Sequence, residues 1–538
     1  MAAGLLSCQP VAAAELPVIP RPLAERPWAG DGATITPGAT VFALSGVDAA
    51  EVEFYRAELG RVLDHEIGIA ENADAATIRF GDAAPSDDWP FVPAGEGYMM
   101  RVGDGAVTVL AKDSAGRFYG LQSMLQMLEQ AAPDETGART LAGVEVMDRP
   151  RFGYRGFMLD ESRHFSGFDA VKRLLDGMAR YKLNRFHWHL TDSPGWRIEI
   201  KAYPELTRIG GRGSETNRDP DQPAQYYTQD QIREIIAYAA QRHIVVIPEI
   251  DMPGHADAAV RAYPEHDGGG YQKWPNFTFN PARAETLEFL ETILREVAAL
   301  FPDAGIIHFG GDEVHFGWHQ WPNLPEVQEL KKRENLDDLQ GVEAWFNRRM
   351  AAFINSLGFK TGGWDEITAR DLPTDKTVIY WWRHDRRDVL DTALERGYPV
   401  VLCPRLPTYF DFVQHESHKT GRRWSGGYNP LPNVYQFPAG LELTEAQESR
   451  VIGIQACLWT EAAVTRARRD FLTWPRLIAL AEAAWTPEER KDFASFEHRL
   501  RPQFAWLDAR GIGYYDPFEN SPEISDIGAQ PEYLDMPE

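Results

Sequence analysis

The pattern of hydrophobic and polar positions changes near residue 154. From there on, short apolar runs alternate with longer stretches in which apolar residues recur every three or four positions. Short runs of this kind predict buried parallel strands, and the longer stretches predict amphipathic helices. The predicted strands are 154–160, 184–190, 244–250, 305–310, 360–364, 377–381, 399–403 and 451–459. The predicted helices are 168–181, 229–241, 283–300, 338–357, 386–396 and 474–484.

This alternation of eight strands with helices indicates an α/β fold, with a (β/α)8 TIM barrel as the catalytic domain. One connection, 365–376, contains Asp371-Leu372-Pro373 and is too short for a regular helix. We therefore expect the helix after the fifth strand to be absent or irregular.

The residues before the barrel predict a smaller α+β accessory domain. Helical periodicity covers 48–64 and 115–130, and two strands, 97–102 and 106–111, flank the hairpin turn Gly103-Asp104-Gly105. No cluster of catalytic residue types falls in this part of the chain. The expected organisation is an accessory domain at 16–148, the catalytic barrel at 149–514 and a Pro-rich, acidic surface tail at 515–538.

Composition narrows the class of protein further. A length of 538 residues, with 43% hydrophobic and 25% charged residues, is ordinary for a folded enzyme of two domains. The formal charge of -25 argues against nucleic acids and anionic membrane surfaces as partners. No run approaches the roughly 20 apolar residues of a membrane span. The 16 tryptophans are numerous, and several stand beside acidic residues, which suits stacking against sugar rings.

The three cysteines, Cys8, Cys403 and Cys457, do not form a disulfide framework. Cys403 and Cys457 end two neighbouring predicted strands and could pair, but two buried free thiols are the favoured interpretation. The first 17 residues are apolar, with three alanines before Glu15 as at the end of a secretory signal, and LLSC at 5–8 resembles a lipoprotein cleavage box. Both lack the expected basic leader. We expect export to the periplasm or the medium.

Residues with functional side chains follow the predicted strands, at the end that carries active sites in barrels of this kind. They are Asp160, Arg163, His189, Asp192, Glu249, Asp251, His255, Asp312, Glu313, Trp364, Asp365, Glu366, Trp381, Tyr409, Asp411, Trp459 and Glu461. Their coincidence at every strand end predicts a single pocket.

An acidic pair, Asp312-Glu313, follows the fourth strand in the run HFGGDE. Each carboxyl group shifts the pKa of the other, so that one can stay protonated and act as an acid on a leaving-group oxygen. Two successive residues cannot easily flank a glycosidic bond from opposite sides, so in a glycosidase the nucleophile would not be a side chain. An exposed acidic turn is the alternative, but Gly310 and Gly311 favour close approach of a ligand.

Six segments, in this order, resemble the family 20 glycoside hydrolases, the β-N-acetylhexosaminidases. They are LDESRHF (159–165), HWHLTD (187–192), PEIDMPGH (248–255), HFGGDE (308–313), YFD (409–411) and LWTE (458–461). DSAGRFYGLQSMLQ (113–126) extends the resemblance to the accessory domain.

The resemblance implies an exo-acting, retaining hydrolase that removes terminal non-reducing β-linked N-acetylglucosamine or N-acetylgalactosamine. The substrate's acetamide oxygen would be the nucleophile, and no cofactor or metal is implied. The expected partners are oligosaccharides that end in N-acetylhexosamine. Chitin oligosaccharides, peptidoglycan fragments and glycoprotein antennae remain open as sources, and the oligomeric state is not predicted.

The same resemblance implies the roles of the site residues. Glu313 is the general acid and later the base, Asp312 holds the acetamide N–H and offsets positive charge, and Asp192 and His255 orient this pair. The implied substrate-binding residues are Arg163, Asp411 and Glu461 for sugar hydroxyls, Tyr409 for the acetamide oxygen, and Trp364, Trp381 and Trp459 for the walls. The family usually has two consecutive acids where this chain has Asp192-Ser193. If the second acid supports the first, its loss would shift the pH profile, but activity is expected to remain because Asp192 keeps the position that points inward.

Other interpretations stay open for several of these residues. Arg163 could pair only with Asp160, and His255 could be an ordinary loop histidine. Trp364 and Trp381 could belong to the core. Arg155, Glu249 and Asp251 are interpreted as structural. The loop 261–277, with Gly268-Gly269-Gly270, is a candidate gate that shapes the site for the sugar beyond the cleaved bond.

Two rival functions remain. His187 and His189 have the spacing of a metal-ligand pair, which His255 and Asp312 could complete in a metal-dependent amidohydrolase or deacetylase. The chain could also be an inactive module that binds amino sugars through its aromatic pocket.

Overall fold

The computed structural model describes residues 16–83, 95–271, 273–423, 427–519 and 521–525. The predicted secretory signal, up to residue 15, and the end of the predicted tail, from residue 526, lie outside these residues. The described chain forms two compact units. One contains the residues up to Arg151 together with Trp485–Gln503, and the other contains Phe152–Ala484 together with the residues from Phe504 on.

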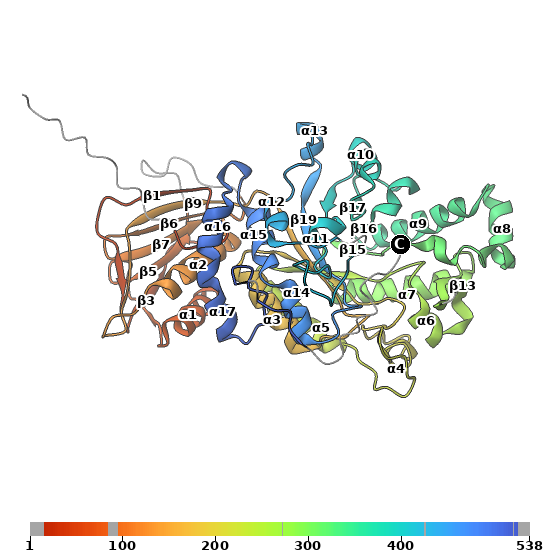
Figure 1. Ribbon diagram of the computed structural model, residues 1–538, viewed down its shortest axis with the longest axis horizontal. Helices are drawn as coiled ribbons and strands as arrows, with labels where there is room; N and C mark the ends of the chain where they lie inside the picture. Colours follow the sequence, from red (N-terminus) through yellow and green to blue (C-terminus); the bar gives the residue numbers. More distant parts are fainter. Residues whose placement is uncertain (1–15, 84–94, 272, 424–426, 520, 526–538) are drawn as a thin grey trace, which may run out of the picture. The chain divides into compact units, whose positions relative to one another are not determined.

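The first unit is built on a seven-stranded sheet with the strand order β1-β9-β6-β7-β5-β3-β4. Helices α1 and α2 pack on one face of this sheet (Figure 1), which confirms the α+β prediction. The strands of this sheet are β1 (Ala24–Pro27), β3 (Thr40–Ala43), β4 (Gly68–Ile69), β5 (Ile78–Asp82), β6 (Tyr98–Gly103), β7 (Ala106–Ala111) and β9 (Val144–Asp148). A separate two-stranded sheet is formed by β2 (Ala33–Ile35) and β8 (Arg139–Leu141). Its helices include α1 (Ala49–Leu63), α2 (Ser114–Gln130) and α16 (Phe493–Leu500).

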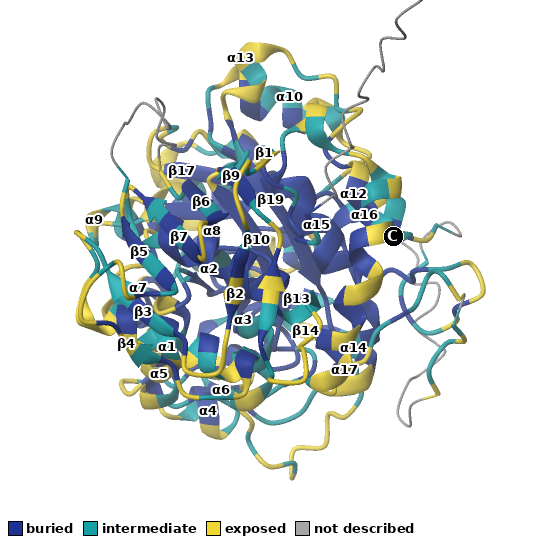
Figure 2. Ribbon diagram, turned by 90° about the vertical axis from the view of Figure 1, so that its left-hand side faces the viewer, coloured by how far each residue is buried: buried dark blue, intermediate teal, exposed yellow. Residues whose placement is uncertain are grey.

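Local chemistry explains where these elements begin and turn. The Asp48 side chain accepts a hydrogen bond from the backbone N–H of Glu51, and Glu51 bonds back to Asp48, a capping box that starts α1. The predicted hairpin is confirmed between β6 and β7, where Asp104 (φ 53°) and Gly105 (φ 80°) make the turn. Helix α2 is buried over most of its length (Figure 2), as its apolar pattern requires.

The second unit contains the predicted barrel, closed by eight parallel strands in the order β10-β11-β12-β15-β16-β17-β18-β19. The strands are β10 (Tyr154–Asp160), β11 (Arg185–His189), β12 (Val245–Glu249), β15 (Ile306–His308), β16 (Lys360–Trp364), β17 (Thr377–Trp381), β18 (Val400–Leu402) and β19 (Val451–Leu458). Each coincides with a predicted strand to within a few residues.

The predicted helices of the barrel are also found, and they lie outside the strands (Figure 1). They are α3 (Phe168–Arg180), α5 (Gln229–Ala240), α7 (Ala284–Leu300), α9 (Leu339–Ser356), α10 (Arg387–Glu395) and α15 (Arg476–Trp485). Shorter elements are α4 (Glu205–Arg208), α6 (Asp257–Ala262), α8 (Pro325–Glu334), α11 (Arg405–Thr408), α12 (Leu431–Gln436), α13 (Glu445–Glu448), α14 (Arg466–Thr473), α17 (Phe504–Ala509) and the hairpin of β13 (Asp267–Tyr271) and β14 (Trp274–Phe279). After β16 only a 3-10 helix, Asp365–Arg370, follows, so the expected irregular connection is confirmed.

The barrel interior is partly apolar and partly polar. Cys403 and Cys457 lie in its apolar cluster as buried free thiols, in agreement with the favoured interpretation. In β11 the strand period of two turns His187 and His189 inward, whereas Trp188 packs against Tyr227 with ring centroids 4.6 Å apart. Part of the predicted C-terminal tail is packed, since Tyr515 is buried.

Gly453 permits closure of the barrel. It lies opposite Tyr154 in the pairing of β19 with β10, and a Cβ atom at this position would stand 1.7 Å from the Tyr154 backbone oxygen. Because a backbone atom cannot move aside, Gly453→Ala is expected to cost about 1–3 kcal/mol or more and to lower the melting temperature. Gly153→Ala, whose Cβ would meet nothing within 4 Å, is the matched control and should melt with the wild type. Equal melting of both variants would contradict this packing.

Candidate active site

The site is organised around the carboxylate of Asp192, which follows β11 and is buried. Arg163 Nη1 lies 2.5 Å from Asp192 Oδ2, and His189 Nε2 lies 2.9 Å from the same oxygen. His255 Nδ1 lies 2.9 Å from Oδ1, and the backbone N–H of Ser193 donates to Oδ1 at 2.6 Å. Burial alone would raise the pKa of Asp192, but Arg163 and His255 hold it well below its ordinary value. Asp192 is therefore ionised.

His255 links Asp192 to the acidic pair. Its Nε2 lies 3.3 Å from Asp312 Oδ2 and 3.5 Å from Glu313 Oε2, and Phe277 packs on the ring with centroids 4.7 Å apart. Burial lowers the pKa of His255, but the carboxylates around it, with Asp192 first, outweigh burial and raise it well above its ordinary value. The imidazolium is thus aimed at both acids.

The acidic pair sits on a turn that only glycines allow. Gly310 (φ 72°) and Gly311 (φ 85°) precede it, and a Cβ on Gly310 would stand 1.8 Å from Asp251 Oδ1. Glu313 itself is left-handed (φ 52°), and 38% of its side-chain surface stays exposed. Its pKa is raised, first by burial of the carboxyl and then by Asp312, while His255 opposes the shift. Burial and Asp312 also raise the pKa of Asp251 well above its ordinary value, which favours the protonated form of this acid.

A second cluster of charged side chains lies near Arg163, and its residues come late in the sequence of the barrel. Arg422 Nε donates to Asp411 Oδ2 at 2.6 Å, and its Nη2 donates to Glu461 Oε1 at 2.8 Å. Burial would raise the pKa of Glu461, but Arg422 and Arg163 lower it below its ordinary value. Arg163 also lies over the Trp459 ring, 5.0 Å from its centroid, and 3.5 Å from Asp160. Its pairing with Asp160 is thus one contact among several.

Sequence reasoning missed Arg422. It lies in a loop with no motif, 11 positions after Asp411, and only the fold brings it between two predicted site residues.

Aromatic rings form one side of the site. Trp364 and Trp459 lie 5.7 Å apart, and Tyr409 lies 6.0 Å from Trp459. Trp381 is buried, but its indole N–H donates to the Arg386 carbonyl at 3.2 Å, and among the described residues no ring contact joins it to these three. The next residue, Trp382, makes such a contact instead: its ring stacks on Tyr409, with ring centroids 6.3 Å apart and an interplanar angle of 11°.

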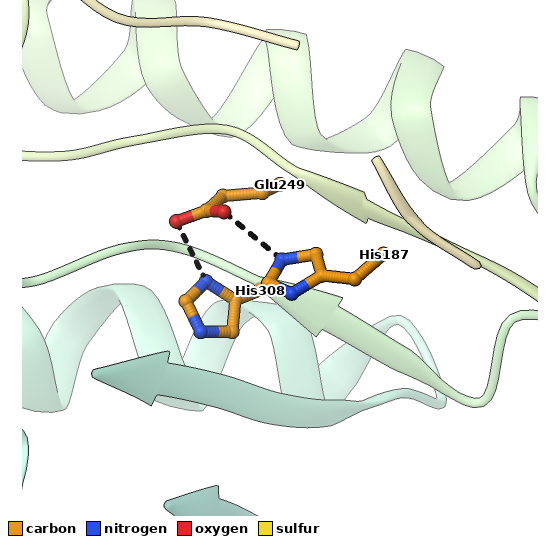
Figure 3. Close-up of side chains that lie close together, drawn as sticks. All are labelled: His187, Glu249 and His308. Carbon is orange, nitrogen blue, oxygen red and sulfur yellow. Dashed lines mark ion pairs between the residues drawn. The ribbon is translucent and has the colours of Figure 1, made fainter. Parts of the chain in front are cut away.

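Behind the pocket lies a buried polar cluster centred on Glu249. His187 Nε2 and His308 Nδ1 stand 2.9 Å and 3.0 Å from its carboxylate (Figure 3), and His189 Nδ1 stands 2.7 Å away. The indole N–H of Trp364 donates to the same carboxylate at 2.9 Å. Glu249, interpreted from the sequence as structural, therefore joins the wall of the pocket to Asp192 through His189.

The same contacts argue against the metal-dependent rival. Gln455 Nε2 donates to His187 Nδ1 at 3.2 Å, so neutral His187 carries its proton on the Nε2 that faces Glu249. Burial lowers the pKa of His187 to about 4, which keeps it neutral. Each nitrogen of His189 faces a carboxylate, and Glu249 and Asp192 outweigh burial and raise the pKa of His189 well above its ordinary value. Both rings are therefore already engaged with side chains of the barrel, which disfavours the metal-dependent rival.

A parallel barrel whose strand ends gather an acidic pair, aromatic rings and paired cations has the architecture of a barrel glycoside hydrolase. The model of glycosyl hydrolase family 20, catalytic domain, matches residues 152–488, and that of family 20, domain 2, matches residues 15–149. The chain belongs to glycoside hydrolase family 20.

Individual relatives agree with this assignment. A β-hexosaminidase of Porphyromonas gingivalis is 36% identical over 479 residues, covering 87% of this chain and 60% of that protein. A β-hexosaminidase of Vibrio furnissii is 38% identical over 402 residues, covering 71% of this chain and 64% of that protein. The chain thus spans less than two thirds of the length of these relatives.

A solved structure is similar along most of the chain. The exo-β-N-acetylglucosaminidase of Vibrio harveyi, in complex with N-acetylglucosamine, superposes with a TM-score of 0.82 at 31% identity. The match covers 94% of this chain and 79% of that one.

Asp192→Asn tests the central network. With that charge removed, the titration of His255 should move to lower pH, because burial is then less opposed. The pKa of Asp192 is lower in the folded state, so the stability that Asp192 contributes is lost as the pH falls below about 4. The pKa of His255 is higher in the folded state, so the stability that His255 contributes is lost as the pH rises through that folded pKa. The variant should therefore lose about 3–5 kcal/mol of unfolding free energy at mildly acidic pH.

The measurements are NMR titration of the histidine ring and urea unfolding at several pH values. Asp388→Asn, at an exposed ion pair with Arg386, is the control and should change neither quantity. An unmoved His255 titration would contradict the network.

Proposed function

We propose that this protein is an exo-acting, retaining β-N-acetylhexosaminidase in which the substrate's acetamide oxygen is the nucleophile. The observation that carries the proposal is the reach of one imidazole, His255, to both Asp312 and Glu313 at 3.3 Å and 3.5 Å. Because these carboxyl groups are successive in the chain and share one imidazole, we place them on the same side of the bound sugar. An ordinary retaining pair must stand on opposite sides of the bond, so the attack on C1 is assigned to the substrate.

The two acids then divide the work. Glu313, whose pKa is raised, protonates the glycosidic oxygen as the bond breaks and later removes a proton from the attacking water. Asp312 accepts the acetamide N–H, which turns the acetamide oxygen toward C1, and its negative charge offsets the charge of the cyclic intermediate. His255 holds both side chains in place, and Asp192 holds His255.

The remaining contacts define the sugar. Arg163 and the Arg422–Asp411–Glu461 cluster supply fixed donors and acceptors for hydroxyl groups on the non-reducing side. Trp364, Trp459 and Tyr409 supply walls that exclude water from the acetamide. The charged pairs at one end of the site support exo cleavage of a terminal N-acetylhexosamine.

The acetamide mechanism is tested with substrates. Aryl N-acetyl-β-glucosaminides carrying mono-, di- and trifluoroacetyl groups should be cleaved progressively more slowly, since fluorine withdraws electrons from the attacking oxygen, while binding changes far less. The aryl β-glucoside with a plain 2-hydroxyl is the control and should be nearly inert. Indifference to fluorination, or a trapped covalent sugar on an Asp or Glu, would restore a two-carboxylate mechanism. Binding without any turnover would favour the inactive module.

Glu313→Gln tests the acid. The variant should lose about 10²–10⁴-fold on chitin oligosaccharides but much less on aryl glycosides with good leaving groups, which barely need protonation. In the wild type, activity should fall as pH rises through the raised pKa of Glu313, and this limb should be absent from the variant with aryl substrates. Glu265→Gln, at an exposed position, is the matched control. Equal losses on both substrate classes would assign Glu313 another role.

A further inference from the structure

The hairpin of β13 and β14 is held firmly against the segment that carries Glu313. Trp321 Nε1 donates to Thr278 Oγ1 at 3.0 Å, and Thr278 Oγ1 donates to the Gly269 carbonyl at 2.9 Å. A Cβ on Gly317, in the 3-10 helix Val314–Gly317 that follows Glu313, would stand 2.2 Å from Thr278 Cγ2. The hairpin therefore has a fixed position relative to the acid.

The three glycines of β13 are explained by this packing. A Cβ on Gly268 would stand 2.3 Å from the Phe279 carbonyl oxygen, and one on Gly270 would stand 2.0 Å from the Trp274 carbonyl oxygen. A Cβ on Gly269 would meet Gln320 at 2.3 Å. Close approach of neighbouring backbone at Gly268 and Gly270, and of the Gln320 side chain at Gly269, is thus sufficient reason for the glycines.

A row of aromatic rings leads outward from the catalytic pair along this hairpin. Phe277 packs on His255, Tyr271 lies 5.4 Å from Phe277, and Phe316 lies 5.1 Å from Tyr271 with an interplanar angle of 34°. The backbone N–H of Phe316 donates to the Glu313 carbonyl at 3.0 Å. Tyr271 and Phe316 are both half-buried, so each ring retains an open surface.

Tyr271 lies within the electrostatic reach of the acid pair. Burial is the main cause of its raised pKa, His255 opposes the shift and Glu313 adds to it. The phenol is therefore near enough to Glu313 to sense its charge.

We infer that Tyr271 and Phe316 form the binding surface for the leaving sugar, a pyranose ring on the reducing side of the cleaved bond. The inference rests on the proposed function. Glu313 protonates the leaving oxygen, so the group attached to that oxygen extends past Glu313, away from Arg163, Asp411 and Glu461. Half-buried aromatic rings with fixed positions suit the flat, apolar faces of a pyranose.

The test compares ligands with and without a leaving sugar. Tyr271→Ala and Phe316→Ala should each lower kcat/KM on chitin tetramer about tenfold. Inhibition by the thiazoline analogue of the cyclic intermediate, which has no leaving sugar, should stay within about twofold of wild type. Tyr271→Phe, which keeps the ring, should retain most of the activity on the tetramer.

Trp274→Phe is the control on the same hairpin, because that ring lies under the Arg218 guanidinium at 3.8 Å and should affect neither ligand. Equal losses on tetramer and thiazoline, or full activity of both alanine variants on the tetramer, would overturn the inference. Failure of the proposed function is distinct, since it would show in the wild type itself, either as no cleavage of any substrate or as indifference to fluorination. Calorimetry would still decide the inference, by whether Tyr271→Ala weakens tetramer binding more than monomer binding.

Discussion

One buried carboxylate, Asp192, holds the site together. It is in contact with Arg163, His189 and His255, three groups that are cationic in this setting, and each contact is 2.9 Å or shorter. Such burial would be prohibitive for a lone charge and is tolerable only when every lone pair is matched. Each cation continues into a different part of the site. Arg163 reaches Trp459, His255 reaches the acidic pair, and His189 reaches the barrel core.

The contact of His189 with Glu249 in the barrel core orients this network of charges. The buried Glu249 carboxylate contacts His189 and accepts a hydrogen bond from the Trp364 indole N–H. The same carboxylate therefore fixes the aromatic wall of the site and, through His189, the orientation of Asp192. Positive and negative groups alternate from Arg163 through Asp192 and His189 to Glu249. Movement of any member would leave a buried charge unmatched, which favours a single arrangement of the catalytic side chains before substrate arrives.

The fold was largely predictable from the sequence, because apolar strand runs and helical periodicity are local signals. The ends of the predicted strands also indicated most of the candidate site residues, because the carboxyl ends of parallel strands meet at one face of a barrel. Arg422 was not predictable, because nothing near it in the sequence marks its contact with Asp411 and Glu461. The adjacent residues Trp381 and Trp382 show what a motif alone does not predict. In the fold, the Trp382 ring stacks on Tyr409, whereas the Trp381 indole N–H donates to a backbone carbonyl.

Backbone geometry, more than side-chain identity, then dictates the type of chemistry. Two glycines at positive φ and a left-handed Glu313 place successive acids under the same imidazolium, which limits how far apart their carboxyl groups can stand. Asp251 packs against Gly310 behind that turn, and its raised pKa disfavours a further negative charge there. A turn built in this way can polarise and protonate from one side. In the mechanism proposed above, the nucleophile therefore comes with the substrate, and the aromatic and charged walls of the site hold it in line.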